Sequence, residues 1–172
     1  MSRTVIFILI SFSFFSFSDK ETNNKEAHGS LFKIERSRDA DQIFYDLQVV
    51  SKDKLDKNNP INIYWVKETE GGKTKPLTWV QQHYAYGLKY TYSSENIAKF
   101  HFVSYNKKRF TLKKDKTGKF QVFTKVNEKE VIVNRIFIQI DGGTFWFPKI
   151  SRVELHGQNP LTNKSLVEII NP

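Results

Sequence analysis

The chain contains no cysteine. A disulfide framework, a thiolate metal site, a cysteine nucleophile and a cysteine-linked lipid anchor are therefore all excluded. A small animal extracellular domain often carries disulfides, whereas an exported bacterial protein commonly has none. The sequence thus favours a bacterial protein that is held together by an ordinary hydrophobic core.

Catalytic motifs are missing as well. The chain has no Gly-x-Ser-x-Gly elbow, no His-Glu-x-x-His zinc helix and no phosphate-binding glycine loop. Its histidines stand at no ligand spacing and its carboxylates form no diagnostic pair, so we predict no catalytic residue, no metal site and no cofactor. An uncharacterised hydrolase stays an alternative, and a cleft in which two or more of four residues converge would favour it: His83, His101, His156 and Asp141.

The N-terminal segment resembles a secretory signal peptide. Arg3 precedes an apolar run, and Ser16 and Ser18 are small residues at the −3 and −1 positions of a cleavage site before Asp19. The run is shorter than the roughly 20 residues that span a bilayer. We therefore predict a signal peptide (1–18), a flexible polar leader (19–29) and a single β-rich domain (30–172) without a transmembrane segment. The protein is expected to be exported, either periplasmic or secreted.

The mature chain alternates apolar and polar residues with the period of β-strands. In residues 42–50, for example, Ile43, Tyr45 and Leu47 share one face. Strands are likewise expected over residues 61–67 and 120–126, and residues 51–60, rich in Lys, Asp and Asn, are expected to form a loop. About nine or ten such segments are separated by turn-forming residues, among them Asp115–Gly118 and Asp141-Gly142-Gly143. This spacing is typical of an all-β, mainly antiparallel fold, and we predict a two-sheet β-sandwich rather than a closed barrel.

One short helix is expected near residues 79–86. Thr78 and Gln81 fit a capping box, in which each side chain satisfies a free backbone amide of the other residue. Gly87 is placed to end the helix in the left-handed conformation. Two helical turns are too few to be stable alone, so packing must hold them.

The helix region also carries a group of aromatic side chains. The candidate ligand-binding residues are Trp79, His83, Tyr84 and Tyr86. Aromatic rings with polar handles suit sugars and other amphiphilic ligands. The alternative, which we favour, is that these rings fill the core beneath the helix.

Positive charge is unevenly distributed. The formal net charge is +9, and between Tyr105 and Lys129 only Asp115 and Glu128 oppose the many lysines. A basic face in this segment would attract an anionic envelope polymer or a lipid surface, and its candidate residues are Lys107, Arg109, Lys113 and Lys119. The favoured alternative is that these side chains simply decorate a solvated hairpin. Nucleic acid is not an expected partner of an exported protein.

Several phrases of the sequence together resemble a known family. They are Leu31-Phe32-Lys33-Ile34-Glu35-Arg36-Ser37, Asn59-Pro60-Ile61-Asn62-Ile63-Tyr64-Trp65, Ala85-Tyr86-Gly87, Pro148-Lys149-Ile150 and Val153-Glu154-Leu155-His156-Gly157. The chain is similar to the bacterial domain-of-unknown-function family 4833, whose members are mostly exported proteins of similar size. The resemblance covers nearly the whole mature chain. It implies one intact domain with a removable leader, and no established activity.

Two functions follow for a protein without catalytic motifs. The leading prediction is an exported, non-enzymatic β-domain that binds anionic envelope components through its basic face. The alternative is a β-barrel that carries a lipid or another apolar ligand. An enclosed apolar cavity would favour the carrier, and a filled core with lysines on one outer face would favour the binding module.

Overall fold

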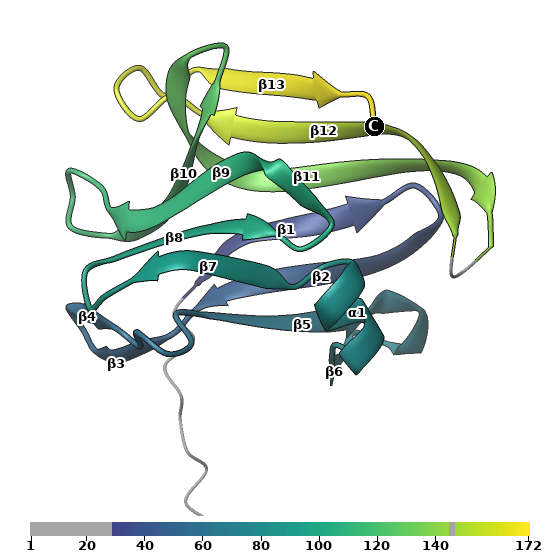
Figure 1. Cartoon of the computed structure of the whole chain (residues 1–172), viewed down its shortest axis with the longest axis horizontal. Coiled ribbons are helices and arrows are strands. Elements are labelled where there is room, and N and C mark those ends of the chain that lie inside the picture. Colours follow the sequence, from purple (N-terminus) through teal and green to yellow (C-terminus); the bar gives the residue numbers. More distant parts are fainter. Residues whose placement is uncertain (1–28, 145–146) are drawn as a thin grey trace, which may run out of the picture.

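The computed structural model describes residues 29–144 and 147–172, so the predicted signal peptide and nearly all of the leader lie outside the described residues. The fold is all-β and mainly antiparallel, with one short α-helix, as predicted (Figure 1). The elements are β1 (Ser30–Arg36), β2 (Asp39–Leu47), β3 (Val49–Ser51), β4 (Lys54–Leu55), β5 (Ile61–Lys67), the 3-10 helix η1 (Glu68–Glu70), β6 (Lys73–Pro76), α1 (Trp79–Tyr84), β7 (Leu88–Ser93), β8 (Ile97–Phe102), β9 (Tyr105–Lys114), β10 (Phe120–Val126), β11 (Lys129–Gly143), β12 (Pro148–Gln158) and β13 (Ser165–Ile170).

The long strand β11 organises the sheet. The strand order is β6-β5-β2-β1-β11-β10-β9-β8-β7, and β12 pairs with the opposite edge of β11 and with β13. Along one edge, β11 pairs first with β10 and then with β1, as Phe123↔Ile132 and Ile34↔Ile136 show. The β1–β11 pair is parallel, and the other pairs of this sheet are antiparallel. The sheet therefore curls on itself into an open half-barrel and does not close.

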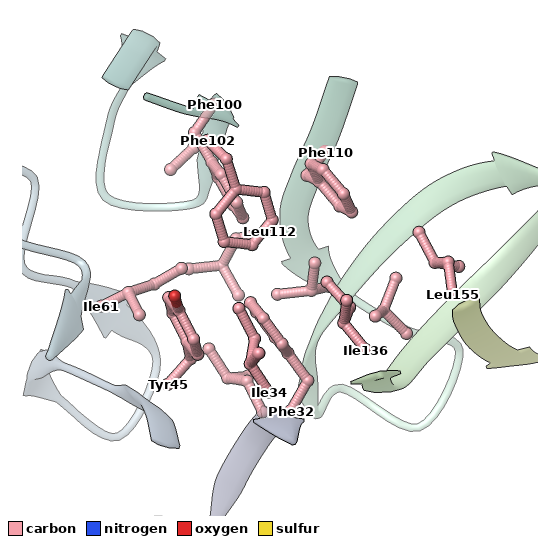
Figure 2. Close-up of a cluster of buried hydrophobic side chains, with 14 of the residues drawn as sticks. Phe32, Ile34, Tyr45, Ile61, Phe100, Phe102, Phe110, Leu112, Ile136 and Leu155 are labelled. Carbon is pink, nitrogen blue, oxygen red and sulfur yellow. The ribbon is translucent and has the colours of Figure 1, made fainter. Parts of the chain in front are cut away.

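Aromatic side chains fill the space inside the curl. Phe32 of β1 stacks on Tyr45 of β2 with 4.3 Å between ring centroids, and Phe102 of β8 meets both rings edge-on. Phe100 and Phe110 stack at 5.5 Å on the β8–β9 side. Figure 2 shows these rings converging from strands far apart in the sequence. Alternate residues of each strand supply this core because successive side chains point to opposite faces.

Predicted and observed strands agree where alternation is regular. The predicted strand over Ile61–Lys67 is observed as β5, whereas the predicted loop 51–60 contains the small β3–β4 pair. The predicted turn at Asp141-Gly142-Gly143 is wrong, because β11 continues through Gly143. The turn comes later, where Phe147 donates its backbone N–H to Thr144 Oγ1 at 3.1 Å. The two glycines instead absorb a register shift between Ile140 and Gly143.

The capping box of α1 is confirmed. Thr78 accepts the backbone N–H of Gln81 at 3.3 Å, and Gln81 Oε1 accepts the Thr78 N–H at 3.0 Å. Gln81 Oε1 also accepts the indole N–H of Trp65 at 3.1 Å, which ties the cap to the core. Gly87 does not adopt the predicted left-handed conformation. Glycine is needed at this position for a steric reason instead. A Cβ there would lie 1.8 Å from the carbonyl oxygen of Gln82.

Removing the cap should weaken the domain measurably. We expect Thr78→Ala to lower the free energy of unfolding by about 0.5–2 kcal/mol, because the backbone N–H of Gln81 loses its hydrogen-bond acceptor. Denaturant unfolding of the two proteins measures the difference. Thr78→Ser keeps the hydroxyl and serves as the control, and an unchanged midpoint in the alanine variant would contradict the role of the cap.

Candidate functional site: an apolar groove on the concave face

The concave side of the half-barrel holds a groove of about 370 Å³. One wall is the inner face of β1, β11, β12 and β13, and the other is formed by the ends of β8 and β9 together with α1. Most of the lining is aliphatic and comes from the first wall: Ile34, Ile136, Ile138, Ile140, Ile150, Val153, Leu155 and Ile170. The pocket is thus a largely apolar cleft of the size that takes small ligands.

Strand register explains why the first wall is continuously apolar. Ile138 pairs with Arg36 of β1 on one side and with Val153 of β12 on the other, and Val153 pairs with Ile170 of β13. Side chains at paired positions stand on the same face of a sheet, so they form a row across four strands. Ile138, Val153 and Ile170 are only half-buried. The row therefore presents apolar surface to the groove.

Lys108 reaches into the groove from the opposite wall. It shares the inward phase of β9 with Phe110 and Leu112, which are buried. Its ammonium forms an ion pair with Glu168 of β13 and donates to the carbonyl of Lys125 at 2.5 Å. Because β9 and β13 are not paired as strands, this contact bridges the two walls on one side of the groove.

Arg36 is the second cation of the lining. Its guanidinium lies 4.5 Å from the ring centroid of Trp65, and it donates to Asp39 at 2.5 Å and to the Tyr86 hydroxyl at 3.2 Å. Burial opposes the charge, but these two partners raise the pKa of Arg36, so the side chain stays cationic. Its buried Nε has no hydrogen-bond partner in the described part of the chain. The charged residues that line the groove are thus two cations, Arg36 and Lys108.

The predicted aromatic group divides between the surface and the groove. Trp79 and Tyr84 are 63% and 67% exposed, and α1 has no buried residue. Trp79 stacks on His83 at 4.5 Å and meets Tyr84 edge-on at 5.7 Å. The interpretation that these rings fill the core is therefore wrong for the three residues of α1, which lies at the edge of the groove. Tyr86 alone packs inward, edge-on to Trp65 at 5.6 Å, and both Tyr84 and Tyr86 line the groove.

The predicted basic face lies apart from the groove. Lys107, Arg109 and Lys113 share the outward phase of β9, and Lys119 is exposed in the turn before β10. Lys113 forms an ion pair with Glu130 at 2.8 Å. Lys114 and Lys108 are likewise paired with acidic residues from outside the basic segment, Asp53 and Glu168. The structure thus neutralises part of the positive charge that the sequence shows.

The residues required by the hydrolase alternative do not share contacts. The ring nitrogens of His83 and His101 lie against backbone carbonyls of Trp79 and Phe102, at 2.9 and 3.0 Å. His101 is 8% exposed and thus buried. His156 contacts Glu154 at 3.0 Å, and Asp141 contacts Gln139 at 2.8 Å. Within residues 29–144 and 147–172, no group of three or more His, Asp or Glu residues could hold a metal ion.

Sequence reasoning missed the two cations that line the groove. Arg36 continues the inward phase of Phe32 and Ile34 in β1, and Lys108 that of Phe110 in β9. A charged residue on the same face of a strand as apolar core residues is the sequence signal from which both cations could have been predicted.

Together these features define an all-β half-barrel domain with an apolar groove on its concave face. The chain belongs to the family described as Domain of unknown function (DUF4833), whose model matches residues 32–169. This match confirms the resemblance stated above. Comparisons with curated proteins and with solved structures gave no match. In the described parts of the chain, no helix is long and apolar enough to cross a membrane.

Proposed function

We propose that this protein is an exported, non-enzymatic domain that binds an apolar chain, such as that of a lipid, in the concave groove. The row of half-buried aliphatic side chains formed by Ile138, Val153 and Ile170 carries the proposal. Each methylene group that leaves water for such a surface contributes about 0.8 kcal/mol. A cleft of about 370 Å³ offers room for several of them.

The polar groups of the lining support an amphiphilic ligand over a pure hydrocarbon. Arg36, Tyr86 and Lys108 stand among the aliphatic residues and can fix the orientation of one polar end. Binding sites for small molecules commonly combine many apolar contacts with a few polar groups in this way. The N-terminal segment that resembles a signal peptide supports export, and lipids abound in the cell envelope.

The outer basic face is a weaker candidate for the main binding site. It presents lysines on the convex side of β9, away from the groove, and Lys113 is already paired with Glu130. Exposed ion pairs and solvated lysines are ordinary surface features. We therefore place the ligand in the groove.

Adjacent isoleucines on β13 provide a matched test. Ile170 lines the groove, whereas Ile169 points to the other face and is 60% exposed. Fluorescence titration with N-phenyl-1-naphthylamine, an apolar dye, measures occupancy of the groove. We expect Ile170→Glu to weaken dye binding by at least about tenfold, equivalent to about 1.4 kcal/mol, and Ile169→Glu to leave it within about twofold.

Controls for folding and a second inward substitution accompany this test. Circular dichroism and thermal melting of both variants establish that they are folded, and Val153→Glu repeats the test from a neighbouring strand. A wild-type protein that fails to bind the dye would overturn the proposal. Equal weakening by the inward and outward substitutions would overturn it too.

A further inference from the structure

We propose that the mouth of the groove docks on the surface of an anionic lipid bilayer. The inference rests on the proposed function in one respect, because a bound bilayer would supply the apolar chain that enters the groove. The docking surface consists of the exposed residues Trp79, Tyr84 and Phe147 together with two cations, Arg38 and Lys149. In Figure 1, the β1–β2 turn and the end of the β11–β12 hairpin lie at the same end of the molecule.

Large apolar side chains are exposed on both lips of the mouth. On the helix lip, Trp79 is 63% exposed and contacts Tyr84, which lines the groove. On the hairpin lip, Phe147 is 82% exposed and directly precedes Pro148, another lining residue. Exposed aromatic side chains that are continuous with an apolar cleft are costly in water and mark an interaction site. Tryptophan and tyrosine are enriched where proteins meet the headgroup region of a bilayer.

Charge at the hairpin lip favours anionic lipids. Arg38, in the β1–β2 turn, is exposed and donates to the carbonyl of Gly143 at 3.4 Å, so it lies beside the hairpin. Lys149 is exposed one residue beyond Pro148. Asp141 stands nearby, and hydrogen bonds from Ser151 and Gln139 hold its pKa below the ordinary value, so one negative charge opposes these two cations. Lysine and arginine side chains near an anionic bilayer are attracted to its negative surface potential.

The same geometry disfavours a bilayer at the opposite side of the groove. There, Lys108 and Glu168 form the bridge between β9 and β13. Along β11 and β12, the lining passes from Ile140 and Ile150 near the hairpin through Ile138 and Val153 to buried Ile136 and Leu155. A chain leaving a bilayer at the lips would therefore meet aliphatic side chains along its path.

Vesicle co-sedimentation of the mature protein tests the proposal directly. The probes are vesicles of pure phosphatidylcholine and vesicles in which about a third of the lipid is phosphatidylglycerol. We expect stronger binding to the anionic vesicles, and at least tenfold weaker binding by the double variant Trp79→Ala/Phe147→Ala. The matched control, Tyr92→Ala/Leu161→Ala, removes two side chains that are 54% and 69% exposed elsewhere, and it should bind like the wild type.

Three further variants separate this surface from the groove and from the basic face. Ile170→Glu should lose the dye but keep vesicle binding, whereas Trp79→Ala/Phe147→Ala should lose vesicles but keep the dye, since neither residue lines the groove. Charge reversal at Arg38 and Lys149 should weaken binding to the anionic vesicles, and reversal at Lys107 and Arg109 should not. The docking proposal is overturned if the wild type does not bind vesicles, or if only charge reversal at Lys107 and Arg109 weakens binding. It is also overturned if Trp79→Ala/Phe147→Ala abolishes self-association of the protein instead of vesicle binding.

Discussion

Replacing Phe32 with alanine is expected to lower the free energy of unfolding by about 3–5 kcal/mol. Phe32 is 2% exposed and lies between the two halves of the curled sheet, where it stacks on Tyr45 and meets Phe102 edge-on. The substitution removes a full aromatic ring and leaves a cavity that neighbouring strands cannot close without breaking their pairing. Because a domain of this size has a net stability of only about 5–15 kcal/mol, this loss is a large fraction of the total.

The strand beside Phe32 supplies a control of the same residue type. Phe44 lies on the outer face of β2, is half-buried and stacks on Tyr64 at a centroid distance of 6.0 Å. We expect Phe44→Ala to lower the free energy of unfolding by less than Phe32→Ala does, since part of the Phe44 ring remains in contact with water. Urea unfolding of the three proteins measures both effects. Equal losses from the two substitutions would show that Phe32 does not hold the halves together.

Alternation along the chain was enough to predict most of the strands. In β5 and β10 apolar residues recur at every second position with few exceptions, and the observed strand bounds match those expected from the sequence. The capping box was equally readable, because the side chains of Thr78 and Gln81 act within a single turn of helix. Local patterns of this kind depend on neighbours in sequence, so the sequence alone reveals them.

The groove could not be predicted, because it depends on which strands become neighbours. Ile138, Val153 and Ile170 each belong to a predicted strand, but only the order β1-β11-β12-β13 aligns them in one row. The pairing of Lys108 with Glu168 joins residues 60 positions apart. The ion pairs of the basic segment could not be predicted either, since Lys108, Lys113 and Lys114 pair with acidic residues that lie outside it in the sequence. The exposure of Trp79 and Tyr84 was not predicted either, because it depends on where α1 lies relative to strands that are distant in the sequence.

The carboxylate of Asp41 is expected to make stability depend on acid pH. Asp41 is 4% exposed, and it accepts hydrogen bonds from Lys67 Nζ at 2.5 Å and from the hydroxyl and backbone N–H of Thr69 at 3.0 and 3.3 Å. The contact with Lys67, followed by those with Thr69, holds the pKa of Asp41 below its ordinary value. A carboxyl group whose pKa is lower in the folded state stabilises the fold above its unfolded pKa of about 3.9. That stabilisation is lost as the pH falls through the folded pKa.

Asp41→Asn should therefore lower the free energy of unfolding by about 2–3 kcal/mol at pH 7, because the partly buried side chain of Lys67 loses its counter-ion. The gap between variant and wild type should begin to narrow below about pH 4, where Asp41 becomes protonated in the unfolded chain, and should close as the pH falls through the lower pKa of the folded state. Asp53→Asn removes a carboxylate that pairs with Lys114 at 2.7 Å but is exposed, and we expect no measurable change from it. Urea unfolding of the three proteins between pH 2.5 and pH 7 checks both expectations; these limits span roughly 1.4 units below and 3 units above the ordinary carboxyl pKa. A gap that stays constant across this range would show that the charge of Asp41 does not stabilise the fold.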